Sequence, residues 1–437
     1  MNVRKETVPP ILFSLLLREI KVSCIMRNRS KAAIGFIFIT ILLDVIGFGI
    51  IIPVVPKLLS HMIQGTMSEA SVYGGFLLFA YSLMQFLFSP VIGNLSDQYG
   101  RRLIILISLF GFGIDYLLTA FAPTIGWLFL GRIIAGITGA SFTTASAYIA
   151  DVSTPENKAQ NFGMIGAAFG LGFIIGPVIG GLLGSYGPRV PFLAAATLTL
   201  LNWIYGYFIL PESLPLEHRK KFSWRNANPV GSLLLLRKYS GLMGLVAGFF
   251  LIYLASHAVN STWSYYSIVK FNWHEREVGI SLGVVGVMVA FVQGFLMRKT
   301  LPLLGQEKSV YIGLSMYAIG MLLFAFATQG WMMYAFTVVY CLGGIAGPAL
   351  QGIISNHIPP NEQGALQGAM TSLVSVTSIF GPLFMTALFS YFTGDSAPFH
   401  FPGAPFTVGA ILMLLSVGFA YRSLFAERQA GMPNSDQ

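Results

Sequence analysis

Long apolar runs that alternate with short polar segments dominate the chain. Each run is about 20 residues long, which suits a helix that crosses the roughly 30 Å hydrocarbon core of a bilayer. We count twelve such runs and predict a transmembrane helix for each. The predicted helices cover residues 33–56, 72–95, 103–121, 125–150, 161–186 and 190–210, then 241–268, 277–297, 309–327, 331–355, 364–392 and 404–424. The pattern therefore predicts an all-α membrane protein.

Composition and charge agree with this interpretation. Of the 437 residues, 55% are hydrophobic and 10% are charged, which is more apolar surface than a soluble domain of this length needs. The net charge of +9 does not indicate nucleic-acid binding, because Lys and Arg collect in alternate polar segments. If both termini are cytoplasmic, all but five of the 26 Lys and Arg residues lie in cytoplasmic segments, and the positive-inside rule favours this orientation. The five are Lys57, Arg132, Arg189, Lys270 and Arg276.

A basic central segment divides the chain into two halves. Residues 211–240 hold eight charged side chains. We therefore predict two six-helix bundles, at residues 32–210 and 241–425, joined by this cytoplasmic loop and followed by a cytoplasmic tail at 426–437.

The two halves also resemble each other, as the halves of a duplicated transporter do. Gly176-Pro177 in the fifth run recurs as Gly381-Pro382 in the eleventh. The charged segment after the second run has a weaker counterpart after the eighth, made of Arg298, Lys299, Gly305 and Lys308. We expect the two bundles to be related by pseudo-symmetry.

Residues 1–31 form a basic extension that we expect to be cytoplasmic. They contain an apolar patch, Ile11–Leu17, which is too short to cross a bilayer and is not followed by a small-residue cleavage site. We therefore expect no signal peptide. The patch could be an interfacial helix, or the segment could be an upstream extension with Met26 as the working start.

The segment Gly93–Arg102, GNLSDQYGRR, lies between the second and third runs. Gly93 and Gly100 are expected to permit close helix approach and a tight turn. Its charged side chains, all at one membrane face, are Asp97, Arg101 and Arg102. A short charged loop can serve only as a topology anchor. The full pattern, however, resembles the signature between helices 2 and 3 of the major facilitator superfamily of secondary transporters.

Two acidic residues, Asp44 and Asp115, lie deep within predicted spans. An acid at the centre of a bilayer costs about 2.5–3.5 kcal/mol on insertion scales, so such residues tend to be functional. Asp44 lies near the midplane and could exchange a proton with a cationic or polar substrate. Either acid could instead make a structural hydrogen bond to a neighbouring helix.

Arg132 lies about 10 Å inside the outer end of the fourth run. It could extend to the membrane surface as an anchor, or it could face a cavity and tune a nearby carboxylate. GRIIAG, from Gly131, resembles the proton-linked motif of the superfamily in this helix. At the inner end of the same run, Asp151 is a candidate partner for Arg101. The resemblance also implies that Asp97 contacts the N-terminal end of the eleventh span in one access state and not in the other.

The fifth run is rich in glycine and reads GAAFGLGFIIGPVIGG from Gly166 to Gly181. It contains two strings of glycines at four-residue spacing, which let helices approach closely in lipid. One string is Gly166 and Gly170, and the other is Gly172, Gly176 and Gly180. Pro177 predicts a kink or hinge. Packing could be the whole role of the run, but it resembles the antiporter motif of drug-exporting facilitators, which implies that it seals the two halves.

Other polar groups within the spans are candidates for substrate or proton handling. His257 and Asn260 lie one turn apart in the seventh span, and the histidine could carry protons. Uncharged amides in the second, eighth and tenth spans, Gln85, Gln293 and Gln351, could orient a substrate or join helices. The sequence shows no phosphate-binding loop, nucleophile elbow or metal-ligand spacing, so we expect neither enzymatic activity nor a cofactor or metal.

Several segments are similar to the tetracycline/proton antiporter family. The similarity extends from about Ile37 to the end of the eleventh run. It is carried by LLDVIGFGIIIPVVPKLL around Asp44, YSLMQFLFSP around Gln85, FGIDYLLTAF around Asp115, GRIIAGITGA, GGIAGPALQG around Gln351, and GALQGAMTSL from Gly364.

This resemblance implies roles for particular residues. Positions that the family implicates in substrate or proton handling are occupied here by Asp44, Gln85, Asp115 and Gln293, and its gating loop is matched by Asp97, Arg101 and Arg102. The family also carries a histidine in the eighth span and an aspartate in the ninth, where this chain has Val289 and Tyr317. In the second half, His257 could substitute for them.

We therefore predict a proton-coupled antiporter that exports a small organic molecule by alternating access of two six-helix bundles in the bacterial inner membrane. Its expected partners are protons, the small-molecule substrate and the lipid bilayer, with no nucleic acid, and we expect a monomer. The alternatives are a facilitator that imports or releases a metabolite, siderophore or sugar, and a transporter-like membrane scaffold or sensor.

Overall fold

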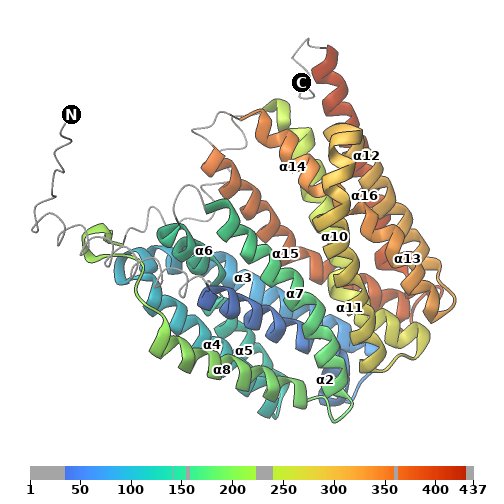
Figure 1. Ribbon diagram of the computed structural model, residues 1–437. Coiled ribbons are helices and arrows are strands. Elements are labelled where there is room, and N and C mark those ends of the chain that lie inside the picture. Colours follow the sequence, from blue (N-terminus) through green and yellow to red (C-terminus); the bar gives the residue numbers. More distant parts are fainter. Residues whose placement is uncertain (1–34, 140, 154–157, 223–239, 359–362, 430–437) are drawn as a thin grey trace, which may run out of the picture.

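The computed structural model describes residues 35–139, 141–153, 158–222, 240–358 and 363–429, and every regular element in these ranges is helical (Figure 1). The first half contains a helix at Gly35–Ile51 followed by α2 (Val55–Ile63), α3 (Met67–Tyr99), α4 (Arg101–Phe121), α5 (Ile125–Thr138), α6 (Ser141–Val152), α7 (Lys158–Gly184) and α8 (Val190–Ile209). The predictions made for residues 1–31, including Met26 as a start, lie outside the described residues.

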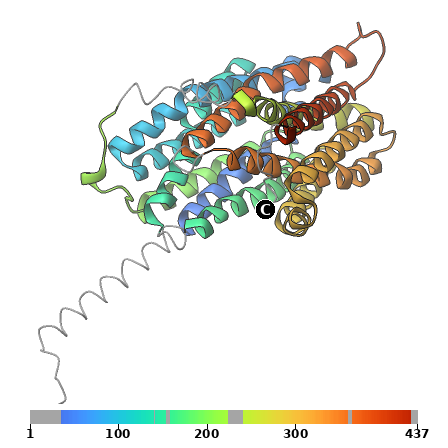
Figure 2. The same cartoon turned by 90° about the horizontal axis from the view of Figure 1, so that it is seen from above.

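Two short 3-10 turns, η1 (Leu216–His218) and η3 (Ser240–Leu242), follow the first half. The second half contains α10 (Met243–Phe271), α11 (Glu275–Phe291), the π-helical turn η4 (Val292–Leu296), α12 (Met297–Phe326), α13 (Gly330–Leu342), η5 (Gly343–Ile345), α14 (Ala346–Asn356), α15 (Gln363–Thr393) and α16 (Ala404–Gln429). In Figure 2 the first-half helices, blue to green, lie beside the second-half helices, yellow to red.

Most helices of the described chain lie within the twelve predicted spans, whereas α2 lies mostly between the first two. By length and composition, ten helices can cross a membrane, or eleven if Gly35–Ile51 and α2 form one span bent by 47°. One of the ten, Glu275–Phe326, covers two predicted spans. The non-helical residue Gly305 separates these two spans. The all-α membrane fold predicted from the sequence is therefore confirmed.

The Gly93–Arg102 segment is almost entirely helical and does not form the loop that its polarity suggested. Helix α3 continues to Tyr99 and α4 begins at Arg101, so Gly100 alone makes the turn, with φ 103° and ψ 153°. This backbone conformation is open essentially to glycine only. In the second half Gly305 has φ 73° and ψ 170°, so the weak sequence repeat corresponds to a repeated glycine turn. The close approach expected at Gly93 is absent in this structure, because a Cβ added there would meet no heavy atom within 4 Å.

Helix α7 contacts a helix of each half at backbone distance. On one face, a Cβ added at Gly176 would lie 2.9 Å from the Cα of Gly49 in the Gly35–Ile51 helix. On another, a Cβ added at Gly279 of α11 would lie 2.9 Å from the Cα of Gly181. Of the two predicted glycine strings, therefore, the one that includes Gly176 packs against a helix. Gly166 and Gly170 of the other string meet nothing within 4 Å, and α7 runs unbroken through Pro177.

The two halves meet chiefly where α7 packs on α11 and α3 packs on α15. Figure 1 shows the helices of the halves inclined to each other and converging at the end that carries α2. We call this the closed end, and we call the end that carries Gly93–Arg102 the motif end. A helix of 33 residues, α3, joins the two ends.

The turn at Gly100 predicts a clear contrast between two glycine variants. Gly100→Ala should destabilise the protein by about 1–3 kcal/mol, because alanine is strained at this φ and ψ. Gly93→Ala should instead stabilise it by about 0.5–1 kcal/mol, because a helix-interior glycine with open space around it gains from a methyl group. Thermal unfolding of the two purified variants in detergent measures both effects, and equal melting temperatures would contradict the strain at Gly100.

Candidate functional site

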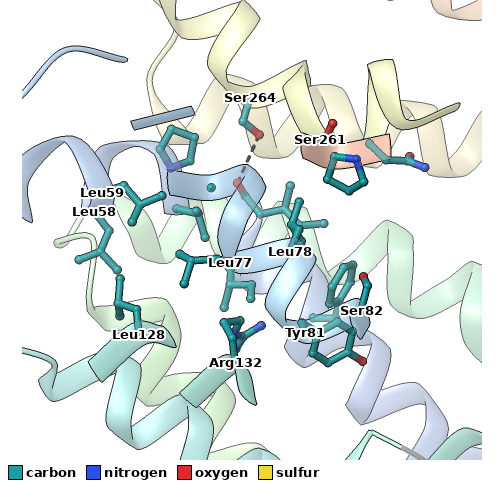
Figure 3. Close-up of a pocket in the computed structure, with 18 of the residues that line it drawn as sticks. Leu58, Leu59, Leu77, Leu78, Tyr81, Ser82, Leu128, Arg132, Ser261 and Ser264 are labelled. Carbon is teal, nitrogen blue, oxygen red and sulfur yellow. Dashed lines mark hydrogen bonds between the residues drawn. The ribbon is translucent and has the colours of Figure 1, made fainter. Parts of the chain in front are cut away.

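A cavity of about 350 Å³ lies between the two halves, and its two walls differ in chemistry (Figure 3). The first-half wall is mostly hydrocarbon, with Leu58 and Leu59 of α2, Leu77 and Leu78 of α3, and Leu128 of α5. The residues that α10 contributes are all polar or aromatic, namely His257, Asn260, Ser261, Ser264 and Tyr265. The cavity can therefore hold a molecule with one apolar face and one hydrogen-bonding edge.

A buried ion pair forms part of the first-half wall. The carboxylate of Asp115 in α4 is fully buried and accepts a hydrogen bond from the guanidinium of Arg132 in α5. Arg132 is 13% exposed and lines the cavity, so it faces inward and does not extend to the membrane surface. The small residue Gly131 leaves room for the second carboxylate oxygen, Oδ1, which has no hydrogen-bond partner among the described residues.

Two further polar side chains of α3 lie beside this pair. The Gln85 amide donates to the carbonyl of Gly139 and to the hydroxyl of Tyr81, both at 3.3 Å, and Gln85 and Tyr81 both line the cavity. The sequence did not single out Tyr81. Its spacing of four residues from Gln85, which places both on one helix face, was the available signal.

Asp44 belongs to the same electrostatic group without lining the cavity. Its side chain is half-buried in the Gly35–Ile51 helix. The phenol of Tyr81 interacts electrostatically with the charge of Asp44 and with those of Asp115 and Arg132. The structure therefore brings the two acids predicted from the sequence close to one tyrosine and one arginine.

The second half provides some of its predicted site residues and not others. His257 and Asn260 line the cavity, and the His257 ring packs against Gly381. In contrast, Gln293 is exposed in the π-helical turn η4 and Gln351 is half-buried in α14, and neither is among the described residues that line the cavity.

The positions of the missing family histidine and aspartate also lie away from the cavity wall. Tyr317 is packed against Tyr340, with ring centroids 4.9 Å apart, and Val289 is a partly buried residue of the hydrophobic core. Neither residue is among the described residues that line the cavity.

Charged groups at the motif end pair within the first half. Arg101 contacts Asp97 at 2.6 Å and Asp151 at 3.3 Å, and the second of these contacts was predicted from the sequence. Arg102 donates to the carbonyl of Tyr207 at 2.6 Å. Glu212, which no sequence pattern indicated, accepts from the backbone N–H of Arg101 at 2.8 Å. Side chains of the first turn of α15 lie outside the described residues, so the contact of Asp97 with that helix stays a prediction.

Comparison with known proteins identifies the family. The model of the Major Facilitator Superfamily matches residues 37–382 and 302–435. The chain belongs to the major facilitator superfamily. The superfamily consists of transporters, and this facilitator is an integral membrane protein.

Curated relatives cover most of the facilitator. It is 40% identical to the class C tetracycline resistance protein of Escherichia coli, over 89% of this chain and 96% of that protein. It is 37% identical to the class G tetracycline resistance protein of Vibrio anguillarum, over the same shares. A crystal structure of a bacterial homologue of the human lysosomal transporter Spinster, inward-facing and unoccupied, covers 92% of this chain and 98% of its own, with a TM-score of 0.73 at 15% identity. That likeness shows the shared fold.

The buried pair of this facilitator predicts an asymmetric mutational cycle. Arg132→Gln should destabilise the protein by about 3–5 kcal/mol, because it leaves the fully buried Asp115 without its cation. Asp115→Asn should cost less, because Arg132 reaches the cavity. The double variant should be more stable than Arg132→Gln alone, because no unpaired charge remains.

Thermal unfolding of the four proteins in detergent measures this cycle. If the double variant instead loses the sum of the two single losses, the ion pair does not contribute as a unit.

Proposed function

We propose that this facilitator exports a small organic molecule in exchange for protons, by alternating access of its two halves. The observation that carries the proposal is the buried Asp115–Arg132 pair in the wall of a cavity between the halves. The relatives named as tetracycline resistance proteins support export and make tetracycline the first compound to test. The protein would work as a monomer in the bacterial inner membrane, with both termini cytoplasmic and without a nucleic-acid partner.

Proton exchange at Asp115 would change what Arg132 can bind. A proton on the carboxylate removes the negative partner of the guanidinium, which then turns to another acceptor in the cavity. Loss of the proton restores the pair. Because Arg132 lines the cavity and Asp115 does not, the proton site and the substrate site would communicate through this one arginine.

Asp44 and His257 are the other proposed proton carriers. Asp44 interacts electrostatically with Tyr81, which lines the cavity. Protonation of Asp44 would therefore change the electrostatic potential at the first-half wall. His257 would be the titratable group of the second half, since Val289 and Tyr317 stand where the antiporter family carries its own. Each proton that enters down a potential of 100 mV supplies about 2.3 kcal/mol, enough for roughly 40-fold accumulation.

Substrate would bind between the apolar and polar walls. Its apolar face would contact the leucines of α2 and α3, while Gln85 and Asn260 would bond its polar edge from opposite halves. Asp44 and Asp115 would act on the substrate indirectly. Gln293 and Gln351 lie outside the cavity in this conformation, so a role in binding would require another one.

Gating would use the motif end and α7. Arg101 holds Asp97 and Asp151 within one half, so Asp97 could exchange this contact for one with α15 as the halves rock. Arg102 would anchor α4 through Tyr207, and Gly100 would set the path of the chain there. Close packing around Gly176 and Pro177 would provide a pivot about which the halves rock, and the helices there would stay in contact throughout the cycle.

Export can be tested with Asp44→Asn in a drug-sensitive bacterium. Cells that express the wild type should tolerate more tetracycline, and a protonophore should remove the advantage. Asp44→Asn should lower tolerance to the vector level, because an amide cannot carry a proton. Asp395→Asn, the same change at an exposed acid outside the helices, is the matched control. Equal tolerance with Asp44→Asn and the wild type would overturn the role of Asp44.

The motif end predicts a different phenotype for Asp97→Asn. The amide weakens the contact with Arg101 but lies outside the cavity, so substrate binding should stay within about twofold while turnover falls tenfold or more. Equilibrium binding and drug efflux from proteoliposomes measure the two quantities separately. Normal turnover would contradict a gating role for Asp97.

A further inference from the structure

Helix α2 covers the cavity at the closed end. It is a nine-residue helix, Val55–Ile63, that follows the Gly35–Ile51 helix after a bend of 47°. Three consecutive turn residues, 52–54, form the bend, and Pro56 lies in the first turn of α2. Leu58 and Leu59 of α2 line the cavity (Figure 3). The short helix therefore forms part of the cavity wall on one side and lies at the end of the bundle on the other.

An ion pair ties α2 to the other half of the molecule. The ammonium of Lys57 lies 2.9 Å and 3.0 Å from the two carboxylate oxygens of Glu275, which is 218 residues away at the start of α11. The ion pairs of Arg101 and Arg132 lie within the first half and that of Arg219 lies within the central segment, whereas this one joins the halves.

The surroundings of Glu275 fix its position. Its side chain is 6% exposed, and a Cβ added at Gly184 of α7 would lie 3.0 Å from the Glu275 Cβ. The N-terminal end of α11 also favours a negative charge at this position. The partner is more accessible, because the Lys57 side chain is 38% exposed. A fixed, nearly buried anion thus meets a cation on a short helix beside a bend.

Neutral hydrogen bonds join the halves at the same end. Ser264 of α10 donates to the carbonyl of Ile52, within the bend, at 3.2 Å (Figure 3). Ser68 of α3 donates to the carbonyl of Ser390 in α15 at 2.8 Å, and the two hydroxyl oxygens are 3.0 Å apart. These contacts would all have to break for the cavity to open at this end.

We propose that α2 is a lid over the cavity and that the Lys57–Glu275 pair is its latch, an inference that rests on the alternating access proposed above. When the lid opens, both charges return to water and recover their hydration, so the pair separates without leaving an unpaired buried charge. An apolar contact of the same size would leave hydrocarbon exposed instead. Leu58 and Leu59 of the lid line the cavity, so a molecule bound there would contact the same helix that carries the latch.

A disulfide reporter measures the population of the closed end directly. Ser68→Cys and Ser390→Cys place two thiols where the hydroxyl oxygens are 3.0 Å apart, away from the latch. The full-length protein in membranes, with Cys24 and Cys341 replaced by alanine, is oxidised with copper phenanthroline. Mass spectrometry then follows the cross-linked peptide over time.

Latch variants should slow the cross-link, and a charge exchange should rescue it. Lys57→Met and Glu275→Gln should each lower the initial rate about tenfold, because the closed end is less populated. The double variant Lys57→Glu with Glu275→Lys should return the rate to within about threefold of the unmodified latch, since an ion pair forms again with the two charges exchanged. Glu277→Gln is the matched control and should leave the rate unchanged, because that carboxylate bonds to the backbone of His274 at the cap of its own helix.

The outcomes separate the latch from the proposed function. Unchanged cross-linking in both single variants, or no rescue by the charge exchange in a protein that elutes as a single species in detergent, would overturn the latch while leaving export intact. If the cross-linked protein still exports at the rate of the reduced protein, alternating access through this end is wrong, and the proposed function fails with it. Export that stops on oxidation and returns on reduction, together with the expected rates, supports both.

Discussion

Backbone contact along α7 is the constraint on which the arrangement of the two halves depends. In lipid, helices gain little from moving apolar side chains from one apolar environment to another, so association relies on close packing. Gly176 meets Gly49 of the first helix, and Gly181 meets Gly279 of α11, both at backbone distance. The first contact holds α7 within its own half, and the second joins the halves, so a larger side chain at Gly181 would push the halves apart and widen the cavity between them. The size of the cavity therefore follows from residues that do not line it.

Ionic contacts divide the molecule in a way that suits two moving bodies. Pairs inside one half, such as Asp115–Arg132 beside the cavity and Asp97–Arg101 at the motif end, can hold that half together whatever the position of the other. The pair between Lys57 and Glu275 depends on how the halves sit, because one partner belongs to each. The ion pair at the closed end thus joins the two halves, whereas the ion pairs of Arg101 at the motif end lie within one half.

Hydropathy located the helices but did not predict where each helix ends. A window of apolar residues measures bilayer thickness, whereas a helix ends only where its backbone turns, so α3 extends through polar residues to Tyr99. Glycine spacing also left open which face each glycine occupies. Gly176 packs, while Gly93 and Gly166 face open space, because the rotation of a helix about its axis depends on its neighbours.

The sequence by itself determined the order of the spans, the division into halves and the glycine turn, because hydropathy and backbone permissiveness are local properties. It also placed an acid and a base, Asp115 and Arg132, at membrane depth. Only the tertiary structure decided which polar groups share the cavity: it brings Gln85 and His257 there and leaves Gln293 outside. It alone paired charges 218 residues apart. Such choices depend on the tilt and rotation of each helix against distant segments, which no local pattern along the chain contains.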